Sequence, residues 1–491
     1  MKNYIKTILI LGLTVFVACD DDLEQTPIGL TTLDQANTTP TVLTLENSVR
    51  SSYDLLSNRL NILAQWDWAG GLVFQNDYVL QDIASDDMEK KWSPDGDQPW
   101  MDDINNFNFT STNGGPNGLW KYNYEAIKRL NIGIEQLVKE DIETITGITT
   151  ERKKQLLGEA YFLRSYYYFS LVTNFGDVPL ILAPVKTYQE AFDVAVRQDK
   201  ALVWEQIKGD LALAKDLLPN TKYSSETEKW RASKGAVIAL MAKSELYTQN
   251  WAAVPPLVDE LAGLGFSLNA NYFENFTSEY TDNEVIFSFD HQTNATPPRG
   301  NGICAPLDWG FFAPSTDFLE SFEPNDPRLL YTVNVAPHNV NKMLGSLDGS
   351  NKGNDAAPNN KVYFRYADAL LWKAEALLET GDYAGAVNII NQIRQRARNG
   401  VDATGVVPPA GTLPDRPASS ESAVVKGWLI QERRHELGFE NQRMLDLKRW
   451  GIAQQVMTAH GKNFQPKHML YPIPQSEIDA SAGTLTQNPG Y

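Results

Sequence analysis

Cysteine is nearly absent from this chain of 491 residues, which contains only Cys19 and Cys304. Cys19 lies at the end of an N-terminal apolar segment where a lipid can be attached, and a lipidated Cys19 leaves Cys304 without a disulfide partner. A chain of this length can bury enough surface to be stable through packing alone. We therefore expect Cys304 to be a small buried residue, the commonest role of a free cysteine.

Recognisable catalytic motifs are also missing. His435-Glu436 begins like a zinc-protease helix, but Phe439 stands where the second histidine is needed. Gly300-x-Gly302 opens no helix that could receive a phosphate, and no G-x-S-x-G nucleophile elbow occurs. We expect a protein that is not an enzyme and needs no cofactor. A glycosidase remains the alternative, because its pair of catalytic carboxylates is defined by distance in space and not by sequence spacing, and the chain is acidic.

A calcium loop begins but is not completed. Asp95 and Asp97 have the spacing of its first ligands, but Pro99 and Trp100 occupy positions that should hold a ligand and the turn glycine. We expect no metal at this segment, and a calcium site built differently elsewhere stays open.

Positive charge is in the minority. The 43 Lys and Arg face 61 Asp and Glu, so the formal net charge is −18. Such a surface repels phosphate backbones, and we expect no nucleic-acid partner. It also repels anionic lipid, and no apolar run after residue 18 is long enough to span a bilayer. Membrane attachment must therefore come from a lipid.

The N-terminus can supply that lipid anchor. Lys2 and Lys6 precede an apolar run from Ile8 to Ala18, as in a secretory signal peptide. Phe16-Val17-Ala18-Cys19 is similar to a lipobox, in which the cysteine becomes the first mature residue and carries the lipid, although bacterial lipoproteins usually have leucine where Phe16 stands. The alternative is an ordinary signal peptide that is cut near a chance cysteine.

We therefore predict a signal peptide over residues 1–18, then a lipidated Cys19 with a polar tether over residues 19–40. Acidic residues follow the cysteine directly: Asp20, Asp21, Asp22 and Glu24. This cluster resembles the export tag that sends lipoproteins of Bacteroidetes-type bacteria to the outer face of the outer membrane, and it is also a solvated linker. We expect a lipid-anchored protein at the cell surface.

Helical periodicity characterises most of the remaining chain. Apolar residues recur every three or four positions in segments that include Val49–Leu56, Trp120–Leu137 and Leu156–Leu171. The last segment ends at Gly176, which can take a left-handed cap conformation.

Two segments look like copies of one helix–turn–helix unit, over residues 240–261 and 372–393. The second has the tight glycine turn and the small residue at the helix crossing that are typical of a tetratricopeptide repeat. Pro255-Pro256 weakens the second helix of the first copy, although a first turn tolerates proline. We interpret the copies as structural helix pairs, with a peptide-binding groove as the alternative.

Loop-forming sequence interrupts this pattern. It covers about residues 66–118 and 265–360, the latter with strand-like pieces such as Val285–Phe289, and also residues 400–420. We predict one domain over residues 41–491, a mainly α helical scaffold with long loop-rich insertions.

The segment from Leu429 to Trp450 alternates in charge at i, i+3 spacing, through Glu440, Arg443, Asp446 and Arg449. We interpret it as a helix–turn–helix that ion pairs stabilise. An anion site built on the arginines is the alternative.

Aromatic residues in the loops are the candidate ligand contacts. Flat aromatic faces stack on the apolar faces of sugars, and nearby carboxylate and amide groups hydrogen-bond hydroxyls. For each aromatic residue, packing within the loop core is the competing role. The candidates are Trp66, Trp92, Asp97, Trp100, Asn105, Asp308, Trp309, Phe311 and Phe312.

Several motifs in order along the chain are similar to those of the SusD/RagB family of outer-membrane nutrient-binding lipoproteins. They are Ala160–Phe169 with Asn174–Leu180, Arg231–Ala236, Glu432–Glu440, Pro472-Ile473-Pro474 and Leu485–Tyr491. Ser85-Asp86-Asp87 resembles the family motif ahead of its first ligand loop.

The resemblance implies a right-handed superhelix of four tetratricopeptide-like helix pairs with a loop-rich ligand face. It also implies a partner, a TonB-dependent transporter of the SusC type, and a ligand, usually an oligosaccharide, that is delivered without cleavage. A surface glycoside hydrolase, or a capture protein for peptides or other nutrients that uses the repeat helices, are the alternative functions.

Overall fold

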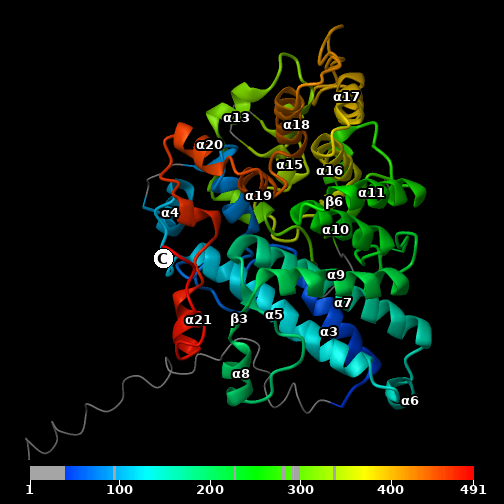
Figure 1. The fold of residues 1–491 in the computed structure, drawn as a ribbon, viewed down its shortest axis with the longest axis vertical. Helices are drawn as coiled ribbons and strands as arrows, with labels where there is room; N and C mark the ends of the chain where they lie inside the picture. The colour runs from blue at the N-terminus through cyan, green and yellow to red at the C-terminus, as the bar shows by residue number, and fades with distance from the viewer. Residues whose placement is uncertain are drawn as a thin grey trace, which may run out of the picture.

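Helices dominate the fold and follow one another through space in chain order (Figure 1). The computed structural model describes residues 39–91, 96–225, 228–277, 283–289, 291, 299–334 and 339–491. The predicted lipobox with Cys19 and the acidic cluster lie outside these residues. Each main helix contacts the next: α3 (Val42–Asp54), α5 (Gly114–Leu137), α7 (Thr150–Phe175), α9 (Lys200–Leu217), α10 (Lys234–Tyr247), α11 (Val254–Gly263), α16 (Tyr366–Glu379), α17 (Tyr383–Asn399) and α18 (Ser422–Leu437).

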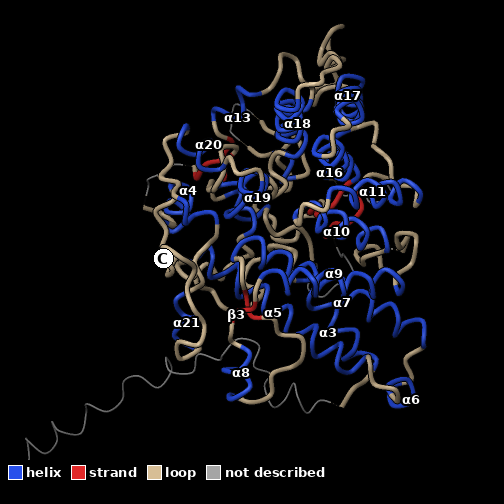
Figure 2. Tube along the Cα trace, viewed as in Figure 1, coloured by secondary structure: helices blue, strands red, loops and turns tan. Residues whose placement is uncertain are grey.

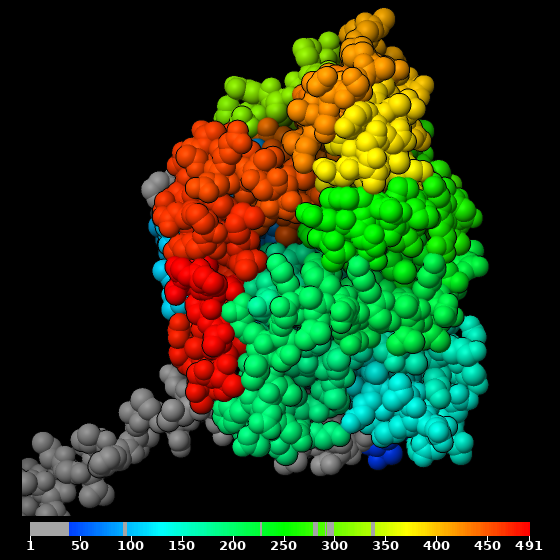
Figure 3. Space-filling view, in the orientation of Figure 1, coloured from blue at the N-terminus to red at the C-terminus, as the bar shows by residue number. Residues whose placement is uncertain are grey.

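This stacking gives the molecule successive layers. Figure 3 shows them as bands, from cyan at the bottom through green to yellow and orange at the top, with the red C-terminal segment along one side. One hydrophobic core, with members from Leu45 to Leu485, runs through the layers. The prediction of a mainly α-helical scaffold is confirmed. Among the described residues, no helix combines the length and the apolarity that a bilayer crossing requires.

Both predicted helix–turn–helix units are present. In the first, α10 is followed by a 3₁₀ turn, η2 (Trp251–Ala253), and by α11, whose first turn contains Pro255-Pro256. Proline is tolerated there because the amides of the first helical turn have no acceptor within the helix, so no hydrogen bond is lost. In the second, α16 and α17 meet at Gly381, which has a φ of +89°. The two units contact each other through α11 and α16.

The central helix α7 ends where its sequence predicts. Phe175 is its last residue, and Gly176 caps it with φ of +74° and ψ of −122°. The positive φ requires glycine, as expected, although this ψ lies outside the left-handed helical region. A leucine side chain, that of Leu470, lies 2.9 Å from where a Cβ on Gly176 would be.

The insertions contain more regular structure than their sequence predicts. Within residues 66–118, α5 begins at Gly114, ahead of the predicted Trp120. The remaining short helices are η1 (Val79–Ile83), α4 (Pro99–Asn106), α6 (Ile142–Thr146), α8 (Tyr188–Val194), η3 (Tyr272–Phe276), α12 (Cys304–Asp308), α13 (Thr316–Ser321), α14 (Arg328–Thr332), α15 (Asn341–Leu344), α19 (Arg443–Arg449), α20 (Ala453–Ala459), η4 (Pro466–Met469) and α21 (Gln475–Ala480). Pro99 and Gly114, which the loop prediction takes as breakers, are the first residues of α4 and α5.

The strands of the described residues form small two-stranded pairs between the helices (Figure 2). The predicted strand Val285–Phe289 is present as β4 and pairs antiparallel with β6 (Lys361–Arg365). The other pairs are β2 (Val178–Pro179) with β3 (Arg197–Gln198), and β1 (Met88–Lys90) with β5 (Phe312–Pro314). The β1–β5 pair matters most here because it joins the two large insertions.

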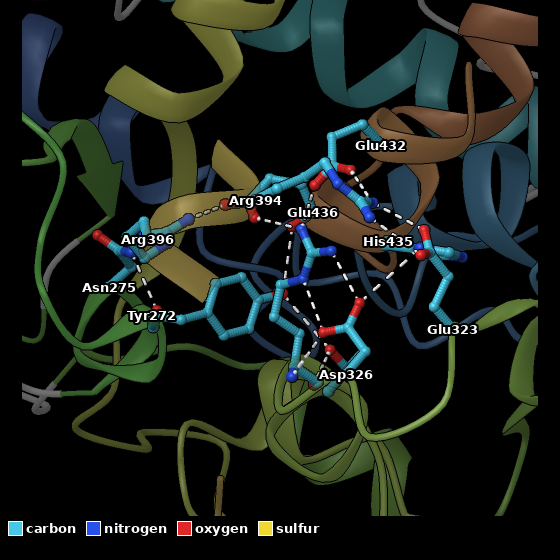
Figure 4. Close-up of polar contacts among 12 residues, drawn as sticks. Tyr272, Asn275, Glu323, Asp326, Arg394, Arg396, Glu432, His435 and Glu436 are labelled. Atoms are coloured by element: carbon cyan, nitrogen blue, oxygen red, sulfur yellow. Dashed lines mark hydrogen bonds and ion pairs between the residues drawn. The ribbon is translucent and has the colours of Figure 1, made fainter. Parts of the chain in front are cut away.

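Buried ion pairs connect the insertions to α18. Figure 4 shows Glu432 and Glu436 of this helix lying among arginines and Asp326. Glu436 Oε1 accepts a hydrogen bond of 2.7 Å from Arg365 and another from Arg396, and Oε2 accepts one of 3.1 Å from Arg328. Burial alone would raise the pKa of Glu436, but the three guanidinium groups hold it well below its ordinary value.

The charged segment from Leu429 to Trp450 is therefore structural, but its partners differ from those predicted. Only Asp446 and Arg449 form the expected i, i+3 pair, at 2.8 Å. Glu440 pairs with Arg365, and Arg443 pairs with Asp86. Tertiary partners displace the local ones because these side chains are buried, where a charge needs several well-directed hydrogen bonds.

Removing one arginine of this network should be costly. Arg365 is fully buried and holds Glu284, Glu436 and Glu440. We expect Arg365→Met to lower the free energy of unfolding by about 3–5 kcal/mol, because it removes one buried cation from three buried carboxylates and leaves negative charge in excess. Urea denaturation measures the change. Arg398→Met is the control, since its pair with Asp415 is partly exposed, with side chains 24% and 59% exposed, and is worth about 1 kcal/mol or less; equal losses would contradict the prediction.

Lys448 is a buried amine with no ionic partner. Within the described part of the chain, no acceptor is within hydrogen-bond distance of its Nζ, which lies 4.2 Å from the ring centroid of Tyr471. Burial lowers the pKa of Lys448 to about 7. The unfolded chain binds this proton up to about pH 10.5, so the folded state loses stability as the pH falls from that value towards 7.

Lys448→Met should therefore stabilise the protein in a pH-dependent way. We expect a gain of about 2–4 kcal/mol at pH 7, where the unfolded lysine is protonated, and a much smaller gain at pH 10. Urea denaturation at both pH values tests this, with the exposed Lys154→Met as control. A gain of the same size at both pH values would show that packing, and not ionisation, is responsible.

Candidate ligand-binding site

Three tryptophans from the two insertions form a row, which we call the aromatic platform. Trp68 lies in the middle, with ring centroids 5.9 Å from Trp66 and 5.2 Å from Trp309. Trp66 is 56% exposed and Trp309 is 40% exposed. They are the only tryptophans among the described residues that are this open to solvent. Exposed rings of this size, gathered in one place, are typical of a binding surface.

Two buried phenylalanines support the platform. Phe74 and Phe311 lie with ring centroids 6.1 and 6.2 Å from that of Trp68, in edge-to-face geometry. Both are almost completely buried. Phe311 also contacts Trp309, at 6.1 Å. Trp68 and Trp309 therefore rest on the hydrophobic core, and Trp66 contacts it through Trp68.

The three indoles do not form one flat surface. Trp66 makes an interplanar angle of 89° with Trp68, and Trp309 makes one of 69°. Edge-to-face contacts of this kind stabilise aromatic clusters. The platform is consequently stepped.

A tight turn presents Trp66 and Trp68. Asp67 Oδ1 accepts a hydrogen bond of 2.8 Å from the Gly70 amide, and its carbonyl accepts one of 2.9 Å from Leu72. The Gly71 amide donates to the carbonyl of Trp68, at 3.1 Å. Aspartate is favoured in such turns because its carboxylate bonds amides a few residues ahead. Trp-Asp-Trp thus places the two rings on either side of the turn residue.

The turn is held against the glycine-rich start of α5. Asn76 Nδ2 donates to the carbonyls of Gly71 and Gly114, at 2.9 and 3.2 Å. A Cβ on Gly71 would lie 1.9 Å from Gly114 O, and one on Gly118 would lie 2.1 Å from Gly71 O. The glycines are required here because two backbone segments meet without room for side chains.

The second insertion reaches the platform through β1 and β5. Lys90 pairs with Phe312 across this ribbon, and the amide of Lys91 donates to the carbonyl of Phe311, at 3.1 Å. Lys90 is buried, and its Nζ lies 3.2 Å from Asp102 of α4 and 5.9 Å from the ring centroid of Phe311. This lysine therefore fixes α4, β1 and the Trp309 segment relative to one another.

Polar groups border the platform on the Trp309 side. Asp308, which precedes Trp309, has a side chain 55% exposed, and its Oδ1 lies 3.9 Å from Lys352 Nζ. The neighbouring Gly353 amide donates to the carbonyl of Cys304, at 2.8 Å, which holds residues 352–353 against the Trp309 segment. Carboxylate and ammonium groups beside exposed rings can hydrogen-bond ligand hydroxyls.

The structure separates the predicted site residues into two groups. Trp66, Trp309 and Asp308 are exposed and lie together, with Phe311 beneath them. Trp92 lies outside the described residues. Trp68 was missed, although its place two residues after Trp66 is a usable sequence signal. Lys352, which lies beside Asp308, was also missed, and nothing in its sequence marks it.

Three of the other predicted contacts, Trp100, Asn105 and Phe312, are buried. Trp100 and Phe312 are 6% and 2% exposed, so packing in the loop core, the alternative role, applies to them. Trp100 Nε1 donates to Gln98, at 2.9 Å. Asn105 is buried and accepts a hydrogen bond of 3.1 Å from Lys462. Asp97 is exposed near the start of α4 and accepts a hydrogen bond from Gln98.

The Ser85-Asp86-Asp87 motif is a structural ion-pair site. Asp86 receives two hydrogen bonds from Arg443, at 2.8 and 2.7 Å, and Asp87 receives one of 2.6 Å from Arg434. Burial raises the pKa of Asp86, but the Arg443 guanidinium outweighs burial and lowers it to about 2.

Asp86, Asp317 and His460 offer ligand atoms within 4.8 Å of one another, which is compatible in distance with a metal ion. Arg443 and Arg434 already hold Asp86, and Arg434 Nη2 lies 2.6 Å from Asp317. A second cation would add to positive charge that compensates these carboxylates already. The donor set therefore fits a metal poorly.

Cys304 is buried, as its sequence context predicts, and donates to Asn359 Oδ1 at 3.4 Å. Burial raises the pKa of this thiol. His435 is buried as well, stacked on Phe322 with centroids 4.4 Å apart. Neither residue has the setting of a nucleophile or a metal ligand.

Two family models match the chain. The one described as "SusD family" matches residues 333–468, and the one described as "Starch-binding associating with outer membrane" matches residues 43–246. SusD-like protein P2 of Formosa agariphila is 25% identical over the full length of both chains. SusD-like protein P38 of the same organism is 28% identical, over 73% of this chain and 77% of its own.

Solved structures share the fold. Surface glycan-binding protein A of Bacteroides fluxus has a TM-score of 0.72 and 23% identity, and the alignment covers 92% of this chain and all of that one. Surface glycan-binding protein A of Bacteroides thetaiotaomicron, in complex with laminarihexaose, has a TM-score of 0.68 and 21% identity, over 91% of this chain and all of that one.

The close approach of the Trp66–Trp68 turn to α5 can be tested with one methyl group. Gly71 and Gly349 both have positive φ, of +69° and +76°, but a Cβ on Gly349 meets nothing within 4 Å. We expect Gly349→Ala to cost about 1 kcal/mol of backbone strain and Gly71→Ala to cost at least about 2 kcal/mol more, because of the clash with Gly114 O. Thermal unfolding compares the two variants; equal losses would show that the turn can move away from α5.

Proposed function

Because the chain belongs to the SusD/RagB family, we propose that it binds an oligosaccharide or polysaccharide at the cell surface and passes it uncleaved to a SusC-type TonB-dependent transporter. One observation carries this proposal. The only strongly exposed tryptophans among the described residues lie together on the aromatic platform, built from two insertions more than 200 residues apart in sequence. The other tryptophans of the described residues are buried or only partly exposed.

The chemistry of the platform fits a sugar. A pyranose ring has apolar C–H faces that stack on an indole and hydroxyl groups around its edge. Trp66 and Trp309 supply the indole faces, and Asp308 and Lys352 supply hydrogen-bonding groups at their border. This combination of a few polar groups with aromatic surface is the usual composition of a small-molecule site.

The relatives support the same ligand class. Surface glycan-binding protein A of Bacteroides thetaiotaomicron was crystallised with laminarihexaose, and another solved relative of the same fold is a laminarin-binding SusD-like protein. We extend glycan binding, but not the particular glycan, from those proteins to this chain.

The lipid anchor and the transporter complete the proposal. Cys19 carries the lipid, residues 19–40 form the tether, and the protein sits on the outer face of the outer membrane. The description of one matching family as associating with the outer membrane supports this location. The helical scaffold then faces the transporter while the insertions face the ligand.

Native affinity electrophoresis of residues 20–491 through gels that contain different polysaccharides tests the proposal. We expect retardation by at least one glycan, and at least about tenfold weaker binding in Trp66→Ala and Trp309→Ala, which corresponds to about 1.4 kcal/mol. The physical reason is the loss of one stacking face. The chain length of the polymer, measured by its reducing ends, should stay constant.

Tyr188→Ala is the matched control, since Tyr188 is 59% exposed but lies on α8, away from the platform. It should bind like the unaltered protein. New reducing ends would identify a hydrolase instead. Retardation by no glycan, with binding of peptides, would favour the capture of another nutrient.

A further inference from the structure

Aliphatic side chains project into solvent at the end of the molecule where the described chain begins. Leu43 in the first turn of α3 is 67% exposed, Val138 just after α5 is 52% exposed, and Ile145 of α6 is 51% exposed. Val42, beside Leu43, is exposed as well. Apolar side chains that gather in one place on a surface indicate a contact with an apolar partner.

These residues lie at one end because α3 and α5 run antiparallel. Ser52 Oγ lies 3.5 Å from the carbonyl of Ala126, and a Cβ on Gly133 would lie 2.5 Å from Ser48 Oγ. In this register the start of α3 lies beside the end of α5, and α6 follows α5 directly in the chain. Figure 1 shows the start of α3, the end of α5 and α6 together at the lower end of the molecule.

Polar contacts hold the elements at this end in place. Thr150 Oγ1 donates to Glu143 Oε2 at 2.8 Å, which joins α6 to the start of α7. Arg152 Nη2, in the first turn of α7, donates to Glu46 Oε2 of α3 at 2.9 Å. Ile142 of α6 is buried in the hydrophobic core. The exposed aliphatic residues are therefore presented by elements with fixed positions.

The predicted lipid attachment is close to this end, which we call the tether end. Thr39, the first described residue, follows Cys19 by 20 positions and leads directly into α3. Twenty residues span at most about 70 Å even when fully extended. A lipid on Cys19 therefore keeps the tether end, in preference to any other part of the molecule, near the bilayer. Such tethering raises the effective concentration of a weak contact to about the millimolar range.

The chemistry of the tether end fits lipid better than protein. Its exposed apolar side chains are all branched aliphatics, whereas tryptophan, tyrosine and arginine dominate the binding energy of protein interfaces. Charges of both signs surround them, from the exposed Lys139, Glu140, Asp141 and Lys154. A mixed border of this kind matches zwitterionic headgroups, which carry both charges themselves.

We infer that the tether end rests on the bilayer, with the side chains of Leu43, Val138 and Ile145 inserted between the lipid headgroups. This inference rests on the lipid anchor of the proposed function and goes beyond it, because it assigns a second, reversible membrane contact. The contact orients the molecule. Figure 1 places α4, which contacts β1, and α13, which follows β5, far from α6, so the aromatic platform is held away from the membrane.

Brominated lipids test the inference on residues 19–491, coupled through Cys19 to a maleimide lipid in phosphatidylcholine vesicles. Cys304 is buried and does not compete for the maleimide. Bromine on the acyl chains quenches tryptophan fluorescence on contact. Side chains at such a membrane contact lie about 5–10 Å deep, so we expect the tryptophan added by Ile145→Trp to lose about half of its fluorescence or more on brominated vesicles.

Val424→Trp is the matched control, since Val424 is 43% exposed but belongs to α18, far from α6 (Figure 1). Its added tryptophan should keep its fluorescence. Leu43→Ser with Val138→Ser, in the Ile145→Trp protein, should remove most of the quenching, although Cys19 still holds the protein on the vesicle. Thermal unfolding checks that each variant is folded, and Leu43→Ser alone gives a second route if the combined variant is unstable.

Three results would overturn the inference. Equal quenching at positions 145 and 424 would show that the anchored protein has no fixed orientation. Quenching that survives the serine substitutions would come from the tether alone. No quenching at either position would leave the tether end to a protein partner. Failure of the proposed function is seen separately, in the affinity gels for the glycan and in the absence of lipid on Cys19 by mass spectrometry of the protein from cells.

Discussion

The pairing of buried charges is the constraint on which the arrangement of this protein depends. Acidic residues in the insertions meet arginines on α18 and α19: Asp86 meets Arg443, and Asp87 meets Arg434. An unpaired charge in a protein interior is strongly destabilising, whereas a well-bonded pair is tolerated. Each insertion can therefore pack stably only where its carboxylates pair with these guanidinium groups. In a chain that can form at most one disulfide, the need to pair buried charges largely determines where the long loops lie.

The aromatic platform follows from that positioning. Because Asp86 and Asp87 are fixed, β1 begins directly after them and is placed to pair with β5. This ribbon brings the Trp309 segment of one insertion beside the Trp66–Trp68 turn of the other. Glycines at the start of α5 then allow the turn to lie flush against the helix. Ion pairs, a short ribbon and backbone packing together hold rings that no single element could arrange.

The same surface combines apolar and charged groups. Buried Phe74 and Phe311 pack against Trp68, the central ring of the platform. Asp308 and Lys352 add charged groups at the Trp309 end of this apolar row. Stacking is tolerant of the sugar's identity, while charge is selective. The division resembles that of many binding sites, in which apolar area supplies affinity and a few polar groups supply specificity.

The sequence by itself determined the helical scaffold, several helix boundaries, the strand Val285–Phe289 and the family. These depend on local periodicity, capping and turn residues, which act over a few positions along the chain. It also indicated that Trp66 and Trp309 are candidate contacts. Only the tertiary structure decided that Trp100 and Phe312 are buried, that Trp68 joins the platform, and that Lys352 lies beside Asp308. Whether such a residue is buried, and which residues lie near it, depends on which distant segments pack together. That packing is set by the pairing of buried charges in the core, and not by a sequence pattern within one loop.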